Sequence, residues 1–87
     1  MKAKTYSLVD TNKWGATVYL RIGQGMREPV DGPHQALMYL LNRWPAERGR
    51  FHAHAKLACL DALERSGSPE LAREAFVYAA MEARLIA

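Results

Sequence analysis

The sequence predicts an α+β fold, in which a β-hairpin is followed by three α-helices within one small domain. Residues 16–22 and 26–30 show the apolar alternation of strands and flank the glycine-containing segment 23–25. Three stretches with helical apolar spacing follow. Prolines lie at the positions where these helices should begin or end, namely Pro33, Pro45 and Pro69.

The length of 87 residues corresponds to a single domain, which we expect to span residues 14–87. Residues 1–13 are weakly patterned. Tyr6 and Leu8 alternate with polar neighbours, which leaves two interpretations open. The segment is either an N-terminal arm or a third strand of the sheet.

The predicted hairpin has one apolar face. Its inward positions are Val18, Leu20, Ile22, Met26 and Val30. Gly23 and Gly25 tolerate the positive φ that a short hairpin loop requires. Pro29 cannot donate a ladder hydrogen bond, so the returning strand should lie at an edge or end early. Because two strands alone are marginal in water, this face must pack on the helices.

The first helix is expected from Pro33 to Trp44, where Pro45 disfavours further helical geometry. Its apolar stripe comprises Ala36, Leu37, Leu40, Leu41 and Trp44. Met38 and Tyr39 lie off this stripe and should be partly exposed. The corner formed by residues 42–49 then leads into the second helix.

The second helix is expected from about residue 50 to residue 65, and the third begins with Ser68 as its N-cap and Pro69 as its first residue. His52 falls inside the apolar arc of the second helix. Alanines on the facing sides of both helices predict that their axes approach closely. The main side chains expected in the core are Leu40, Trp44, Phe51, Cys59, Leu63 and Phe76.

The composition argues against several classes of protein, including membrane-spanning, secreted and disulfide-bonded proteins. The longest strictly apolar run, residues 75–81, is far shorter than the roughly 20 residues that cross a bilayer. Charged residues interrupt the N-terminus, so we expect no signal peptide and a cytoplasmic location. The single cysteine, Cys59, excludes an intrachain disulfide. The net charge of +3 is modest for a dedicated nucleic-acid binder.

Several segments together resemble a known bacterial family. They are residues 40–45, Arg48-Gly49, His52, Ala55, residues 58–60, Ala62-Leu63, Ala72-Arg73, Ala75-Phe76 and Ala79-Ala80. The chain resembles the family catalogued as domain of unknown function 982, whose members are small proteins mostly from soil and plant-associated alphaproteobacteria. The resemblance covers about residues 14–86 and departs from the family at Thr17, where proline is frequent. It implies two strands followed by three helices, and it implies no activity.

His52 and Cys59 are the residues of the second helix with the most chemical potential. They are seven positions apart, which places them on one face but about 10 Å apart along the axis. Cysteine–histidine catalysis requires hydrogen-bond contact and a third group that orients the base. We therefore expect Cys59 to be a core residue. We expect His52 to lie at the edge of the core and to bond a backbone carbonyl near the Trp44–Pro45 corner.

No pattern in the sequence predicts a catalytic, metal or cofactor site. His52 and His54 point to different sides of a helix and cannot chelate one ion together. The segment 23–25 lacks the lysine and the following helix of a phosphate-binding loop. An enzyme is thus disfavoured, although catalytic groups can also come together only in the folded state.

The leading hypothesis is a small non-catalytic protein-interaction or regulatory module, which could also self-associate through the hairpin edge or the first helix. It is motivated by the missing catalytic pattern and by the off-stripe Met38, Tyr39 and Trp14. The alternative is nucleic-acid binding through the hairpin and the basic corner. The residues proposed for a ligand or partner site are Met38, Tyr39, Arg43, Trp44, Arg48, Arg50 and His52.

Overall fold

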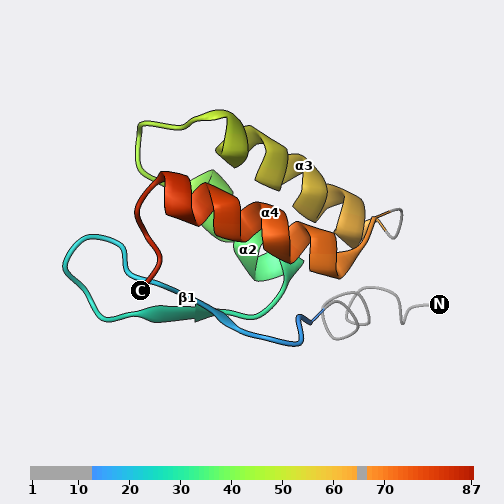
Figure 1. The fold of residues 1–87 in the computed structure, drawn as a ribbon, viewed down its shortest axis with the longest axis horizontal. Coiled ribbons are helices and arrows are strands. Elements are labelled where there is room, and N and C mark those ends of the chain that lie inside the picture. Colours follow the sequence, from blue (N-terminus) through green and yellow to red (C-terminus); the bar gives the residue numbers. More distant parts are fainter. Residues whose placement is uncertain (1–12, 65–66) are drawn as a thin grey trace.

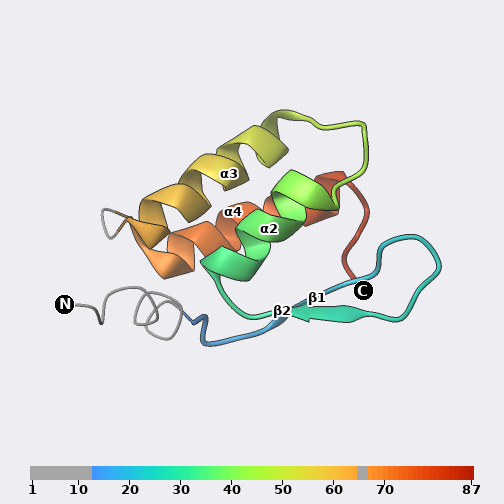
Figure 2. The same cartoon turned by 180° about the vertical axis from the view of Figure 1, so that it is seen from behind.

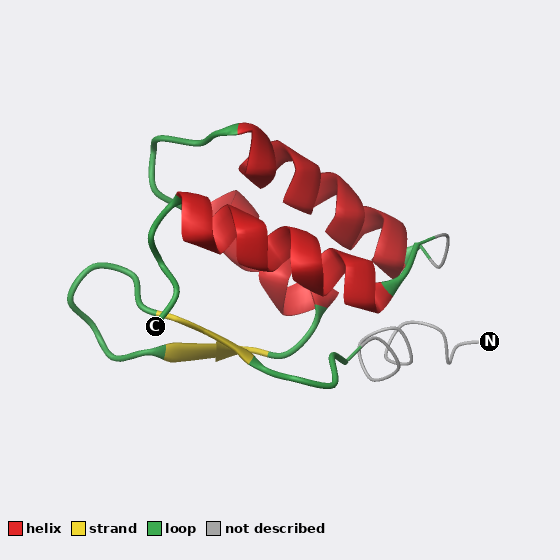
Figure 3. Cartoon of the chain, viewed as in Figure 1, coloured by secondary structure: helices red, strands yellow, loops and turns green. Residues whose placement is uncertain are grey.

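The computed structural model describes residues 13–64 and 67–87 and shows a two-stranded antiparallel hairpin followed by three helices (Figure 1). The helices form a layer that lies on one side of the hairpin (Figure 3). The α+β class and the order of elements are therefore as predicted. The N-terminal strand considered at Tyr6 and Leu8 falls outside the described residues.

The hairpin consists of β1 (Val18–Leu20) and β2 (Glu28–Val30), with Val18 opposite Val30 and Leu20 opposite Glu28. Val18, Leu20 and Val30 are buried, as the alternation predicts. Both strands are shorter than expected. The placement of Met26 in the core was wrong, because this side chain lies in the connecting loop, where strand alternation does not apply, and is 85% exposed.

The C-terminal residues pair with the other edge of β1. Arg21 donates its backbone N–H to the carbonyl of Leu85 at 2.8 Å, and Ala87 donates to Tyr19 at 3.0 Å. An isolated bridge joins Leu20 and Ile86. Both views show the chain end lying beside the hairpin (Figures 1 and 2). The sheet thus gains a short third partner from the end of the chain.

The three helices are α2 (Pro33–Asn42), α3 (Arg50–Leu63) and α4 (Pro69–Glu82). Helix α2 ends two residues before Trp44, and α3 also ends slightly earlier than predicted. The Ser68 hydroxyl caps α4 by accepting from the N–H groups of Glu70 and Leu71 at 3.1 and 3.2 Å. Helices α2 and α4 therefore begin at the prolines that the sequence indicates.

Small side chains bring α3 and α4 together. The buried positions are Ala55, Cys59 and Ala62 on α3, and Ala72, Ala75, Ala79 and Ala80 on α4. Such residues let helix axes approach closely, as the alanine pattern predicts. Phe76 of α4 is fully buried, and the ring of Trp44 packs against it with the ring centroids 5.6 Å apart.

Three expectations about aromatic and apolar side chains were wrong. Trp14, counted among the off-stripe residues that motivated an interaction module, is only 6% exposed and packs against Phe76 with the centroids 5.7 Å apart. Phe51, expected in the core, is 39% exposed and stacks on Tyr78, because His52 rather than Phe51 turns toward the interior. Leu41 is 50% exposed, since α2 buries its other side. Leu63 is partly buried against the core.

Candidate functional site

His52 connects the end of α2 to the start of α3. Its side chain is buried, and Nε2 lies 2.9 Å from the carbonyl oxygen of Leu40. A carbonyl can only accept, so Nε2 carries the proton and donates. The Leu40 carbonyl lies in the last turn of α2, where carbonyls lack helical partners. His52 therefore satisfies a helix end, which is the backbone contact expected near the corner.

The aromatic neighbour of His52 is Trp44, with the ring centroids 6.0 Å apart. Trp44 is itself buried between His52 and Phe76. These two residues of the predicted partner site consequently belong to the core, and their polar and aromatic atoms contact the protein interior rather than solvent.

Arg43 and Tyr39 both bind Glu28 on the hairpin. Arg43 makes a two-pronged contact, with N–O distances of 2.6 and 2.9 Å, and the Tyr39 hydroxyl donates to Glu28 at 2.6 Å. The Arg43 hydrogen bond, with that of Tyr39, lowers the pKa of the Glu28 carboxyl. Burial, followed by the Glu28 contact, raises the pKa of the Tyr39 hydroxyl. This cluster fastens β2 to α2.

The other corner arginines have contacts of their own. Arg48 donates from Nε to the carbonyl of Pro45 at 3.1 Å and from Nη2 to that of Trp44 at 3.3 Å. The Arg50 guanidinium lies 5.9 Å from the centre of the Phe51 ring. Each arginine thus makes its own local contact. Arg48 closes the corner, Arg43 joins the corner to the hairpin, and Arg50 lies near the Phe51 ring.

Cys59 is fully buried in α3, and burial raises the pKa of its thiol to about 12. At neutral pH such a thiol is protonated and a poor nucleophile. Across residues 13–64 and 67–87, no cluster of three or more His, Cys, Asp or Glu side chains could hold a metal ion. In the same residues no helix is long and apolar enough to cross a membrane.

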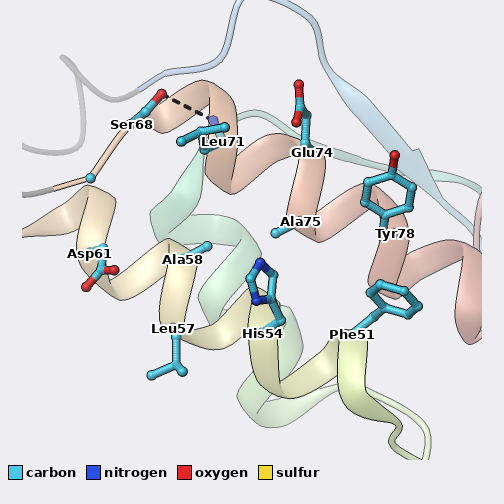
Figure 4. A pocket seen from close by; sticks show the side chains of 11 residues that line it. Phe51, His54, Leu57, Ala58, Asp61, Ser68, Leu71, Glu74, Ala75 and Tyr78 are labelled. Carbon is cyan, nitrogen blue, oxygen red and sulfur yellow. Dashed lines mark hydrogen bonds between the residues drawn. The ribbon is translucent and has the colours of Figure 1, made fainter.

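An apolar groove runs along the surface between α3 and α4 (Figure 4). Its volume is about 580 Å³. Phe51 and Tyr78 stack at one end, and Gly67 and Ser68 lie at the other. The remaining lining residues are His54, Leu57, Ala58, Asp61, Leu71, Glu74 and Ala75.

A second apolar groove, of about 410 Å³, lies between α2 and α3. It is lined by Leu37, Leu41, Ala53, Lys56, Leu57 and Leu60. Leu57 lines both grooves and is 64% exposed. We call the exposed face of α3 that separates the two grooves the α3 ridge. It comprises Arg50, His54, Leu57, Leu60, Asp61 and Glu64.

Of the α3 ridge, sequence reasoning proposed only Arg50 for a partner site and missed its leucines. Leu57 and Leu60 lie outside the apolar arc assigned to this helix, and the sites proposed from the sequence centre on the corner instead. Met38, which is exposed on α2, and Tyr39 line neither groove. One signal in the sequence could have indicated this surface. Two leucines, Leu57 and Leu60, occur among the polar residues of the solvent-facing side of the helix, and apolar residues grouped on a surface indicate a binding site.

A family model matches most of the chain. The sequence model of a protein family described as "Protein of unknown function (DUF982)" matches residues 16–87. The chain belongs to this family. The match covers both strands and all three helices, including the α3 ridge. No curated protein and no solved structure matches the chain. The predicted family, DUF982, is therefore confirmed, and its description assigns no activity.

Proposed function

We propose that this DUF982 protein is a non-catalytic protein-interaction module whose binding surface is the α3 ridge with its two flanking grooves. The observation that carries the proposal is the position of Leu57, an exposed leucine at the boundary of two apolar grooves. Exposed apolar surface of this kind, rimmed by polar residues, marks sites of protein association. A helix with apolar residues at three- and four-residue spacing fits such a groove.

The chemistry of the most reactive side chains supports a binding role. Cys59 is buried with a raised thiol pKa, and His52 uses its Nε2 to hold the end of α2. Neither side chain is placed to attack a substrate or to transfer a proton to one. The groove floors instead consist largely of methyl, methylene and ring groups, which favour association through apolar contact.

The basic corner gives less support to nucleic-acid binding. Arg43 is paired with Glu28, and Arg48 donates to two carbonyls of its own loop. A phosphate would have to compete with these contacts. The interaction surface on α3 carries both signs of charge, whereas binding to a polyanion favours an excess of positive charge.

The proposal is tested by site-specific photo-crosslinking in the cells that naturally produce the protein. A photoreactive amino acid at position 57 should form covalent adducts with protein. The matched control at Met26, a more exposed apolar residue on the hairpin, should not. Excess unmodified protein should compete for the adducts, and excess Leu57→Asp protein should not. Adducts at position 26 alone, or adducts at neither position, would contradict the proposal.

A further inference from the structure

The charges of the α3 ridge are arranged around Leu57 in a way that suits one particular partner. Arg50 precedes Leu57 by seven residues, and Glu64 follows it by seven. Seven residues are two helical turns, or about 10 Å along the axis. The ridge is therefore basic at one end, apolar at its centre and acidic at the other end, with the charges at equal distances from Leu57.

We propose that the partner is a second copy of this chain, packed through antiparallel contact of the two α3 ridges with a twofold axis near Leu57. This inference rests on the proposed function and names the occupant of the surface. In a twofold interface each residue meets its counterpart reciprocally. Antiparallel helices related by an axis at Leu57 place Arg50 of each copy level with Glu64 of the other.

Both ends of such a pair gain from electrostatics. Neither Arg50 nor Glu64 has an ion pair with another side chain in the part of the chain that the structure describes. Helix α3 carries no acidic residue in its first turn and no basic residue in its last. Its own charges thus run against the helix dipole. Antiparallel packing brings the acidic end of one α3 beside the positive end of the other.

The grooves fit the same arrangement. A helix packed beside α3 lies in the groove between α3 and α4, and twofold symmetry places α3 in the equivalent groove of the second copy. The result is a four-helix contact formed by α3 and α4 of each chain, with leucines at its centre. Leu57 and Leu71, both exposed in the single chain and both lining this groove, supply apolar surface that this contact buries.

Sedimentation equilibrium of the full chain, from micromolar to millimolar concentration, tests the proposal. The protein should show a reversible monomer–dimer equilibrium. Leu57→Asp should raise the dissociation constant by about tenfold or more, because it places two carboxylates together at the apolar centre. Met26→Asp, a matched change on the hairpin, should leave it unchanged. Circular dichroism should show the same helix content in both variants.

Charge exchange tests the antiparallel register. Arg50→Glu alone and Glu64→Arg alone should each weaken the dimer by about tenfold, since each creates two like-charge contacts. The double variant should restore association. A purely structural role of either residue predicts no such restoration. Oxidation of Leu57→Cys should join two chains covalently, whereas Met26→Cys should not, and the buried Cys59 should remain unreacted.

The outcomes separate the two proposals. A strict monomer at millimolar concentration overturns self-association, and crosslinks from position 57 to a different protein would then still support the interaction module. A dimer that is insensitive to Leu57→Asp overturns the proposed surface. Failure of the double charge exchange to restore association overturns the antiparallel register.

Discussion

His52 and Cys59 are buried polar or ionisable side chains on one face of α3, and each has a structural explanation. The His52 ring bonds a carbonyl at the end of α2, while Cys59 contributes a small side chain where α3 meets α4. Both contacts concern the packing of helices. The residues therefore offer two direct measurements of stability that do not depend on knowledge of the partner.

Replacement of His52 by alanine should destabilise the fold by about 2–3 kcal/mol. The change leaves the Leu40 carbonyl buried without its donor and removes a ring that packs on Trp44. His54→Ala is the matched control, because His54 is exposed on the same helix, and it should change stability by less than about 0.5 kcal/mol. Urea unfolding of both variants measures the difference. Equal effects would show that the hydrogen bond is unimportant.

Cys59 should make stability fall at alkaline pH. Its thiol pKa rises from 9.0 to about 12 on folding. Between these values the unfolded chain loses the thiol proton and the folded chain retains it, so the unfolded state gains stability as pH increases. The loss is about 1.4 kcal/mol per pH unit. Urea unfolding at pH 8 and pH 10.5 should show a larger decrease for the wild type than for Cys59→Ala. Parallel decreases would rule out this contribution.

At the scale of elements, a glycine lies near each end of α3. Gly49 is its N-cap, and Gly67 follows its C-terminal end; the two have different surroundings. A Cβ added to Gly67 would lie 2.8 Å from the Cβ of Asp61 and 3.2 Å from its backbone carbon. A Cβ added to Gly49 would meet the carboxylate of Glu82, which is the movable end of a flexible side chain. The two glycines therefore differ in what must shift on substitution.

Gly67→Ala should cost about 1–3 kcal/mol, because the helix backbone itself must move. Gly49→Ala should cost less than about 1 kcal/mol, since the Glu82 side chain can rotate away and the extended backbone at Gly49 is one that alanine also adopts. Thermal unfolding of the two variants under identical conditions compares them directly. A larger loss for Gly49→Ala would contradict the assignment of the tight contact.

The end of α4 determines where the chain reaches the sheet. Arg84 adopts a positive φ of 62°, and the N–H groups of Arg84 and Leu85 return to the carbonyls of Met81 and Ala80. This closure of the helix end reverses the chain direction. Leu85 then enters the core and Ile86 stays on the surface. The last residues, 85–87, consequently pair with β1 and stabilise the hairpin.

At the scale of the whole molecule, the C-terminal segment joins the helical layer to β1. Leu85→Ala should therefore destabilise the protein by about 2–4 kcal/mol. Ile86→Ala, a neighbouring change of similar size at a half-exposed position, should cost less than about 1 kcal/mol. Guanidinium unfolding of the two variants measures the comparison. Similar losses would mean that the segment contributes little to packing.

Local patterns predicted much of the fold because they act over a few residues. Alternation placed Val18, Leu20 and Val30 inward, and prolines located the starts of α2 and α4. The same reasoning failed at Trp14 and Phe51. An aromatic residue outside any periodic segment gives no sign of its burial. A residue at the edge of an apolar arc can turn either way, depending on how neighbouring helices pack.

The sequence by itself determined the order of two strands and three helices, the family, and the small-residue contact between α3 and α4. Only the tertiary structure decided that Phe51, Leu57 and Leu60 of α3 are exposed. Alanines and leucines occur around much of this helix, so its periodicity does not define a single buried face. Packing of α2 and α4 against His52, Ala55, Cys59 and Ala62 leaves Leu57 outward between two grooves. The proposed interaction surface therefore depends on contacts between residues that are distant in sequence.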